Sequence, residues 1–161
     1  MQRTAAVITV SDRSAAGERD DASGPVAVDA LRAAGFACED AAIVADGADS
    51  VEAGLRAALA AGARLIVTTG GTGVGPRDLT PEGTRRVVTR ELPGIAEELR
   101  RLSTAEKPAG MLSRGVAGVV DGSGALVVNL PGSPRAVASG IPVIVSIAGH
   151  VIDQLGGSDH S

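Results

Sequence analysis

Aromatic residues are almost absent from this sequence: Phe36 is the only Phe, Tyr or Trp among 161 residues. Proteins that read single-stranded nucleic acid stack bases on aromatic side chains, so this composition argues against that class of function. Hydrophobic residues still make up 44% of the chain. The core must therefore be built from Val, Ile, Leu and Ala, in a composition that is ordinary for a globular domain.

Cysteine, lysine and basic patches are also scarce. The single cysteine, Cys38, excludes an internal disulfide and a cysteine-based zinc site. The formal net charge is −4, the pI is about 5.1, and no basic segment is dense enough to hold a nucleic-acid backbone. Lys107 is the only lysine, so phosphate binding would depend on arginine, backbone N–H groups or a metal ion.

Long uninterrupted hydrophobic runs are missing as well. We expect neither a membrane span nor a signal peptide, because residues 1–4 lead directly into a short apolar segment. The sequence predicts a cytoplasmic protein without a membrane or nucleic-acid partner. Its length fits one domain, which we place at residues 1–155, followed by a disordered polar tail at residues 156–161.

Strand and helix patterns alternate in the first half of the chain. Apolar, β-branched runs predict three strands, at residues 5–10, 36–44 and 65–69. Two helices are expected between them, at residues 23–34 and 51–61, and a polar loop at residues 11–21. Ser23 would cap the first helix and Gly35 would end it, while Asp49 or Ser50 would cap the second. This order predicts an α/β fold with helices on both faces of a mostly parallel sheet.

The second half contains further helices and a hairpin. Pro81 and Glu82 would start a helix that runs to about Arg90, and a helical pattern resumes at residues 95–102 after Pro93-Gly94. Residues 116–120 and 125–129 flank a turn sequence and predict a hairpin. A final helix is expected to begin after Ser133 and to run to residue 155, with a break near residues 140–142.

Unusual polar residues follow the predicted strands at the points where the strands end. Ser11 and Asp12 follow the first strand, Asp46 follows the second, and a glycine-rich stretch follows the third. Ligands of open α/β sheets bind outside the carboxyl ends of the strands, so these segments should meet at one rim.

The glycine-rich stretch begins with Thr69, Gly70, Gly71, Thr72 and Gly73. It is neither a Walker A loop, which requires Gly-Lys-Ser/Thr, nor a G-x-G-x-x-G dinucleotide fingerprint. Glycines nevertheless allow backbone N–H groups to approach an anion closely. The pattern favours phosphate binding over its alternative, a tight loop without a ligand.

Asp78 follows this loop, and its carboxylate would repel a phosphate unless Mg²⁺ lay between them. Its neighbour Arg77 could contact phosphate oxygens directly. Each acidic residue also has a simpler interpretation, without a metal. Asp78 could cap the turn that follows it, Asp46 could form a turn before Gly47, and Asp12 could cap its loop. Three acidic residues at three strand ends favour a shared metal site.

Several motifs in order resemble those of the MogA/MoaB molybdopterin-binding family, which includes the G domains of gephyrin and of its plant counterpart. The resemblance covers the chain from about residue 5 to 155. It is carried by Val10-Ser11-Asp12-Arg13, Asp21-Ala22-Ser23-Gly24-Pro25, Thr69-Gly70-Gly71-Thr72-Gly73, Pro76-Arg77-Asp78-Leu79-Thr80-Pro81-Glu82, Leu112-Ser113-Arg114 and Asn129-Leu130-Pro131-Gly132-Ser133-Pro134.

This resemblance implies a three-layer α/β/α fold, a homotrimer, and the Mg²⁺-dependent reaction of molybdopterin with ATP to give adenylylated molybdopterin and pyrophosphate. A molybdenum insertase is a possible partner. The two functionally important aspartates of the family match Asp46 and Asp78, which we expect to be catalytic and to hold the metal. One departure is Gly47, where the family commonly has an acidic residue after the aspartate.

We divide the remaining candidates between the two substrates. The nucleotide phosphates are expected at Thr69, Gly70, Gly71, Thr72, Gly73 and Arg77. The molybdopterin side is expected at Ser11, Asp12, Ser113, Arg114, Pro131, Gly132 and Ser133. Two other functions stay open: a non-catalytic molybdopterin carrier, as divergent relatives suggest, and a related nucleotide hydrolase. The retained acidic residues favour the transferase over the carrier, and Thr72-Gly73 with Arg77-Asp78 favours it over the hydrolase.

Overall fold

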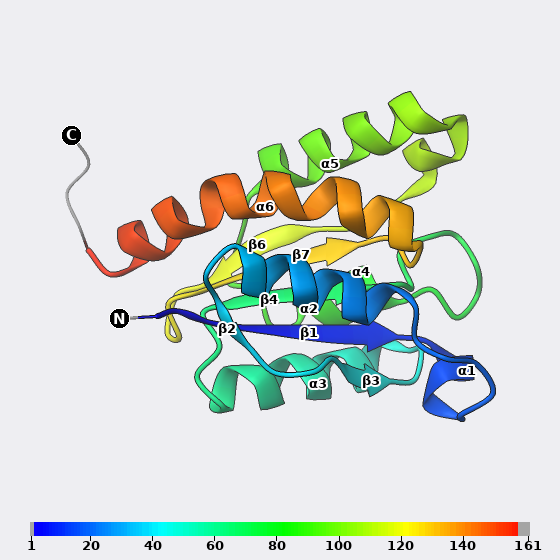
Figure 1. The fold of residues 1–161 in the computed structure, drawn as a ribbon, viewed down its shortest axis with the longest axis horizontal. Helices are drawn as coiled ribbons and strands as arrows, with labels where there is room; N and C mark the ends of the chain where they lie inside the picture. Colours follow the sequence, from blue (N-terminus) through cyan, green and yellow to red (C-terminus); the bar gives the residue numbers. More distant parts are fainter. Residues whose placement is uncertain (1, 158–161) are drawn as a thin grey trace.

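A computed structural model describes residues 2–157. The elements run along the chain as β1 (Thr4–Val10), α1 (Asp12–Ala15), α2 (Ser23–Ala33), β2 (Ala37–Cys38), β3 (Ala42–Val44), α3 (Ala48–Ala60), β4 (Leu65–Thr69), α4 (Thr80–Arg85), β5 (Arg90–Glu91), α5 (Pro93–Glu106), the 3-10 helix η1 (Pro108–Leu112), β6 (Ala117–Val120), β7 (Ala125–Leu130) and α6 (Pro134–Leu155) (Figure 1).

The strands form one seven-stranded sheet in the order β2-β1-β4-β7-β6-β5, with β3 also paired to β1. The pairs that join β1, β2, β3, β4 and β7 are parallel. The hairpin β6–β7 and the short β5–β6 pair are antiparallel. The expected mostly parallel sheet and the predicted hairpin are therefore confirmed.

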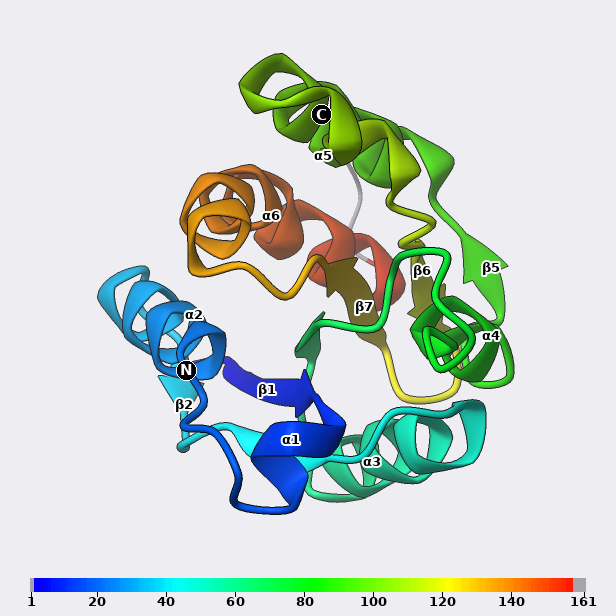
Figure 2. The same cartoon turned by 90° about the vertical axis from the view of Figure 1, so that its right-hand side faces the viewer.

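Helices cover both faces of this sheet, which makes three layers (Figure 2). Successive side chains of a strand point to opposite faces. On β1, Ala5 and Val7 pack into the core shared with α2, α5 and α6, whereas Ile8 and Val10 pack into the core shared with α3. Strands buried on both faces read as continuous apolar runs, and this is why the sequence pattern located β1 and β4 correctly.

Several local predictions are wrong, each for an identifiable reason. The polar loop after β1 contains a short helix, α1, which Ser11 caps by accepting a hydrogen bond from Ser14 N at 3.2 Å. The strand predicted at residues 36–44 is two short edge strands, β2 and β3. Glycine at position 47, with a φ of 124°, begins α3 in place of a capping Asp49 or Ser50. Helix α4 ends at Arg85, earlier than expected, before the unpredicted β5.

Helix α6 is continuous across Pro142, where a break was expected. Proline removes the hydrogen bond to the carbonyl of Ala138, but both residues lie at exposed positions, where water can serve that carbonyl. The buried residues Val137, Ile141 and Ile144 hold the helix against the core on either side. Ser133 caps this helix as predicted, by accepting a hydrogen bond from Ala136 N at 3.1 Å.

Within residues 2–157, α6 is also a helix long and apolar enough to cross a membrane by length and composition. The expectation drawn from uninterrupted apolar runs missed it. A helix of a folded core meets the same criteria, so it is weak evidence for a membrane segment. Its C-terminal end is a turn formed by Gly156 and Gly157, while residues 158–161 of the predicted tail lie outside the described residues.

Candidate active site

A groove with a volume of about 1110 Å³ opens at the carboxyl ends of β1, β4 and β7. The parallel pairing of these three strands brings the segments that follow them to one rim. Most of the predicted site residues line this groove: Ser11, Asp46, Thr69, Gly70, Gly71, Thr72, Gly73, Asp78, Ser113, Pro131, Gly132 and Ser133. Asp12, Arg77 and Arg114 are not among its lining residues.

The loop after β4 requires glycine at two successive positions. Gly70 has a φ of +93°, and a Cβ there would lie 2.4 Å from the carbonyl oxygen of Val10. Gly71 has a φ of +69°, and its Cβ would lie 2.2 Å from Thr80 Oγ1. The hydroxyl of Thr80 donates to Gly70 O at 2.9 Å, and Thr80 N donates to Gly71 O at 3.1 Å. The start of α4 therefore holds the loop in its left-handed turn.

This turn leaves a row of backbone donors without protein partners. Within the described residues, the N–H groups of Gly71, Thr72 and Gly73 donate to no acceptor, nor do those of Gly132 and Ser133. The two loops are neighbours, since a Cβ on Gly132 would lie 3.3 Å from Gly70 Cα. Unpaired N–H groups on adjacent glycine-rich loops form a cradle suited to an anion.

Asp46 is held by Asp12 through a reciprocal pair of hydrogen bonds. Asp12 N donates to Asp46 Oδ2 at 3.0 Å, and Asp46 N donates to Asp12 Oδ1 at 3.1 Å. Burial raises the pKa of the Asp46 carboxyl, and the negative charges of Asp12 and Asp78 add to the rise. The remaining Oδ1 of Asp46 is 3.4 Å from the Cβ position of Gly71, so this carboxylate lies against the glycine-rich loop.

Arg77 contacts Asp12 with both arms of its guanidinium. Its Nε donates to Asp12 Oδ2 at 2.9 Å, and its Nη2 donates to Asp12 Oδ1 and to the Asp46 carbonyl, both at 3.0 Å. This pairing holds the pKa of Asp12 below its usual value. The sequence predicted that Arg77 could contact a phosphate, but the structure gives it two aspartates as partners.

Arg114 plays the corresponding part beside Asp78. Its Nη1 donates to Glu82 Oε2 at 2.7 Å, its Nη2 to the Asp78 carbonyl at 2.6 Å, and its Nε to Gly73 O at 2.8 Å. The guanidinium of Arg114 holds the pKa of Glu82 below its usual value. Arg114 was expected on the molybdopterin side, but the structure places it among the loop carbonyls. Glu82 was missed because it was treated only as a helix start.

The carboxylate of Asp78 lies beneath the glycine-rich loop. Its Oδ2 accepts a hydrogen bond from Gly75 N at 2.9 Å and lies 3.0 Å from the Cβ position of Gly73. The alternative in which Asp78 caps the turn after it is not seen, since α4 begins at Thr80 and has no side-chain hydrogen bond at its N-cap, Leu79. Asp78 instead faces the stretch of loop that carries the free N–H groups.

Another carboxylate of the groove, Asp21, was quoted in a motif but given no role by the sequence. Its Oδ2 accepts from Thr9 Oγ1 at 2.7 Å and its Oδ1 accepts from Gly24 N at 2.9 Å. Asp21 thereby accepts a hydrogen bond from the first turn of α2, a task predicted for Ser23, while the N-cap residue, Ala22, has no side-chain hydrogen bond. The Ser23 hydroxyl pairs instead with Thr69 Oγ1 at 2.9 Å, which ties the start of α2 to the end of β4. The signal was an aspartate three residues before a glycine amide.

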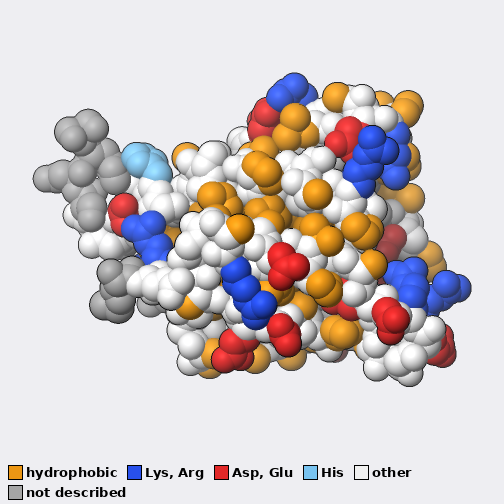
Figure 3. Space-filling view, in the orientation of Figure 1, with side chains coloured by type: hydrophobic (Ala, Val, Ile, Leu, Met, Phe, Trp, Pro, Cys, Tyr) orange, Lys and Arg blue, Asp and Glu red, His pale blue; other side chains and the backbone are white. Residues whose placement is uncertain are grey.

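Three cationic side chains that were not predicted as site residues also line the groove: Arg19, Lys107 and Arg135. The Nε atom of Arg135 lies 3.7 Å from Oε2 of Glu106, so these two side chains form an ion pair. Within residues 2–157, the exposed side chains of Arg19 and Lys107 have no hydrogen bond or ion pair. Basic side chains are visible at the end of the molecule near α1 and the C-terminal end of α5 (Figure 3). These two cations are available to a bound anion.

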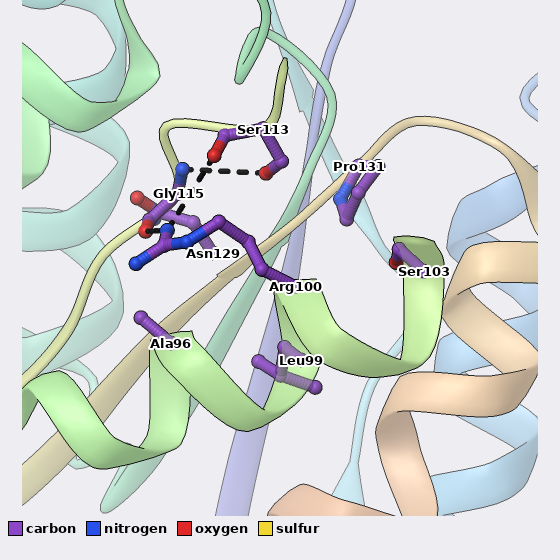
Figure 4. A pocket seen from close by; sticks show the side chains of 8 residues that line it. All are labelled: Ala96, Leu99, Arg100, Ser103, Ser113, Gly115, Asn129 and Pro131. Atoms are coloured by element: carbon purple, nitrogen blue, oxygen red, sulfur yellow. Dashed lines mark hydrogen bonds between the residues drawn. The ribbon is translucent and has the colours of Figure 1, made fainter. Parts of the chain in front are cut away.

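The Ser113 segment is held from behind by α5. Arg100 Nη1 donates to Gly115 O at 2.9 Å and approaches Ser113 O at 3.4 Å (Figure 4). The buried Asn129 accepts from Val116 N at 3.1 Å and donates to Thr68 and Thr84. Between them lies a cavity of about 10 Å³, which is the size of one water molecule. The predicted Ser113 is therefore positioned by groups outside the groove.

Two carboxylates of the groove, those of Asp46 and Asp78, are the candidates for binding a metal ion. No group of three or more His, Cys, Asp or Glu side chains suited to a metal occurs within residues 2–157. Asp46 and Asp78 both line the groove, and the negative charge of Asp78 contributes to the raised pKa of Asp46. Mg²⁺ typically uses one or two carboxylates together with water and substrate phosphates. The pair fits that manner of binding and does not fit a site made of protein ligands alone.

A family model described as "Probable molybdopterin binding domain" matches residues 6–150. The chain belongs to this family. The molybdopterin-binding domain so matched contains every residue of the groove discussed above. The expected family and the three-layer α/β/α fold are thus confirmed.

Known members of the family are similar over most of this chain. A molybdenum cofactor biosynthesis bifunctional protein of Synechococcus elongatus is 42% identical over 97% of the chain, which covers 48% of that protein. A molybdopterin adenylyltransferase of Pyrococcus furiosus is 40% identical, covering 91% of the chain and 87% of that enzyme. The solved structure of the molybdopterin biosynthesis Mog protein from Mycobacterium ulcerans is 40% identical with a TM-score of 0.89, covering 98% of this chain and 99% of that one. The chain spans about half the length of the bifunctional relatives.

Proposed function

We propose that this chain transfers the adenylyl group of ATP to molybdopterin, in molybdenum cofactor biosynthesis. The main observation behind this proposal is that Asp46 and Asp78 lie in one groove with a row of free backbone N–H groups. Relatives named molybdopterin adenylyltransferase support this choice, among them the Pyrococcus enzyme at 40% identity. Carboxylates beside an anion cradle suit a reaction between two phosphorylated substrates better than they suit simple anion storage.

In the proposed reaction an oxygen of the molybdopterin phosphate attacks the α-phosphorus of ATP. The bond from that phosphorus to the bridging oxygen breaks, and the electron pair leaves with pyrophosphate. Asp46 and Asp78 would hold Mg²⁺, which neutralises phosphate charge in such transfers. The N–H groups of Gly71, Thr72 and Gly73 would hold nucleotide phosphates, and Ser11, Ser113, Gly132 and Ser133 would contact molybdopterin. The protein contributes positioning and charge stabilisation rather than a covalent intermediate.

The decisive experiment measures pyrophosphate release from ATP and Mg²⁺ with and without molybdopterin, followed by detection of the adenylylated pterin. Protein concentration must be obtained by amino-acid analysis, because the chain has no Trp or Tyr. We expect pyrophosphate and product to form together and only when molybdopterin is present. Tight pterin binding without pyrophosphate would contradict the proposal and identify a carrier. ATP hydrolysis that ignores the pterin would identify a hydrolase.

We also propose a cytoplasmic homotrimer that delivers its product to a molybdenum insertase. The face formed by α2, α5 and α6 carries scattered hydrophobic side chains, which a second copy could cover (Figure 3). Light scattering coupled to size-exclusion chromatography should give three times the chain mass of 15.9 kDa. A monomeric mass would contradict the trimer and leave the transferase proposal intact.

A further inference from the structure

The two groove aspartates that the proposed function uses are supported in the same way. Each has its main-chain carbonyl held by an arginine, Asp46 by Arg77 at 3.0 Å and Asp78 by Arg114 at 2.6 Å. Each arginine also donates two hydrogen bonds to a second carboxylate, which does not line the groove. Arg77 bonds Asp12 in this way, and Arg114 bonds Glu82.

We propose that Arg77 and Arg114 are positioning residues that fix the carboxylates of Asp46 and Asp78, and that neither binds substrate phosphate. This inference rests on the proposed function for its kinetic consequences. We call each set of contacts a clamp: one joins Arg77 to Asp12 and Asp46, and the other joins Arg114 to Glu82 and Asp78. The two unpaired cations of the groove, Arg19 and Lys107, are left to neutralise the substrates.

Three of the five guanidinium N–H donors of Arg77 are already committed. Its Nε and Nη2 form a bidentate contact with Asp12, and the same Nη2 bonds the Asp46 carbonyl. A substrate phosphate that bound Arg77 in a bidentate manner through Nε and Nη2 would have to break this charge-assisted fork, which matches guanidinium and carboxylate geometry well. Asp12 also exchanges two hydrogen bonds with Asp46, so movement of Asp12 would move Asp46.

Arg114 is committed more completely. It bonds both oxygens of Glu82 and the carbonyls of Gly73 and Asp78, while its own N–H donates to Thr72 O at 2.7 Å. These bonds draw the carbonyls of the loop away from the groove. The N–H groups of the same loop are the ones left without partners. The clamp therefore orients the anion cradle as well as the metal-site carboxylate.

Lysine cannot reproduce a clamp of this kind. Its ammonium is a point charge without a planar fork, so it preserves charge but not the simultaneous contacts to carboxylate and carbonyl. Arg77→Lys therefore separates the two roles. A phosphate contact would be largely rescued by lysine, whereas a positioning role would not.

The test compares Arg77→Gln, Arg77→Lys, Asp12→Asn and the double variant Asp12→Asn/Arg77→Gln. Arg86→Gln is the matched control, because Arg86 is likewise paired with two carboxylates, Asp49 and Glu52, but lies away from the groove. Hydrogen exchange of the Asp12 and Asp46 amides should quicken about tenfold in the Arg77 and Asp12 variants and stay unchanged in the control.

At saturating substrate, turnover should fall at least about tenfold in Arg77→Gln, Arg77→Lys and Asp12→Asn alike, while the KM for ATP changes less than about twofold. The double variant should be no worse than the worse single variant, since both remove one clamp. Mn²⁺ binding in the presence of ATP, followed by electron paramagnetic resonance, should weaken in parallel. Arg114→Lys should reproduce these kinetic effects at the second clamp.

Three results would overturn the inference. One is unchanged amide exchange in Arg77→Gln. Another is rescue by lysine together with a raised KM for ATP in Arg77→Gln, which would make Arg77 a phosphate ligand. The third is an additive loss in the double variant. If the wild-type protein forms no adenylylated product, the proposed function fails, and the exchange and Mn²⁺ measurements still decide the clamp.

Discussion

Asp12 and Asp46 cap each other across the end of the sheet: the backbone amide of each donates to the carboxylate of the other, at 3.0 and 3.1 Å. They follow neighbouring strands, β1 and β3, which are paired in parallel. The two loops are thereby joined at the rim of the groove. The sequence left open that each of these aspartates only caps a loop or turn. Both aspartates do form such caps, and Asp46 in addition lines the groove.

The carboxylate of Asp78 should be required for turnover and dispensable for pterin binding. Asp78→Asn keeps the shape of the side chain and an oxygen acceptor for Gly75 N, but removes the charge. We expect a loss of turnover of roughly 100- to 1000-fold, the usual effect of removing one electrostatic stabiliser. Molybdopterin affinity, measured by fluorescence of the pterin, should change less than about twofold. Lost pterin binding would instead place this carboxylate in the pterin site.

Glycine at position 71 is required by both conformation and space. Gly71→Ala forces a side chain into φ +69° and places its Cβ 2.2 Å from Thr80 Oγ1. Left-handed backbone costs an alanine about 1–2 kcal/mol, and displacement of Thr80 adds to this. The melting temperature should fall by roughly 3–8 °C. Gly122→Ala is the control, since nothing lies within 4 Å of its Cβ position. Equal melting temperatures for the two variants would refute this account of the loop.

The Glu82–Arg114 pair should make stability depend on pH in the acid range. The folded-state pKa of Glu82 lies below the usual value of a glutamate, chiefly because Arg114 donates hydrogen bonds to it. Stability from the ionised form is present above the unfolded pKa and is lost as the pH falls through the folded pKa. Glu82→Gln should cost about 1 kcal/mol or less at pH 7, because both side chains are more than a third exposed.

This cost should shrink toward zero as the pH falls through the lowered folded-state pKa of Glu82, because the native carboxyl is then protonated too. Urea unfolding at a series of pH values measures it. The exposed substitution Ser146→Ala serves as the control, with a difference that is constant across the series. A Glu82→Gln cost that grows as the pH falls would contradict the lowered pKa.

The sequence predicted the sheet well because its evidence is local. The buried runs of β1, β4 and β7 are apolar on both faces, and the glycine-rich loop directly follows one of them. Most of the predicted groove residues lie one to four positions beyond a strand, where the parallel pairing must gather them. Placement of Ser11, Asp46 and Gly70 therefore needed only the strand ends and the topology.

The partners of the arginines could not be predicted in this way. Arg77 meets Asp12 across 65 positions and Arg114 meets Glu82 across 32, and neither pair has a spacing that a helix or hairpin would impose. Long side chains also reach away from their backbone positions, so Arg77 can neighbour the groove in sequence and still bond outside it. Such pairings are set by tertiary packing after the strands have fixed the loops.

The unpaired cations of the groove should carry the charge of substrate binding. Arg19 and Lys107 come from the segment after α1 and from the turn between α5 and η1, and both line the groove without an ion pair within residues 2–157. Arg19→Gln and Lys107→Gln should each raise the dissociation constant of pyrophosphate roughly three- to fivefold, the effect of one partly exposed charge contact. Isothermal titration calorimetry at 0.1 M salt measures this.

Arg13→Gln is the matched control, because Arg13 is also exposed and unpaired in the described chain but does not line the groove. Arg13→Gln removes the same positive charge. Equally weakened pyrophosphate binding in all three variants would therefore indicate a general electrostatic effect and not local contacts. Raising the salt to about 0.5 M should reduce the effects at Arg19 and Lys107, since exposed charges are screened within a few ångströms at that ionic strength. A salt-insensitive loss confined to Lys107 would point to a structural defect in the α5–η1 turn, which the melting temperature of that variant would reveal.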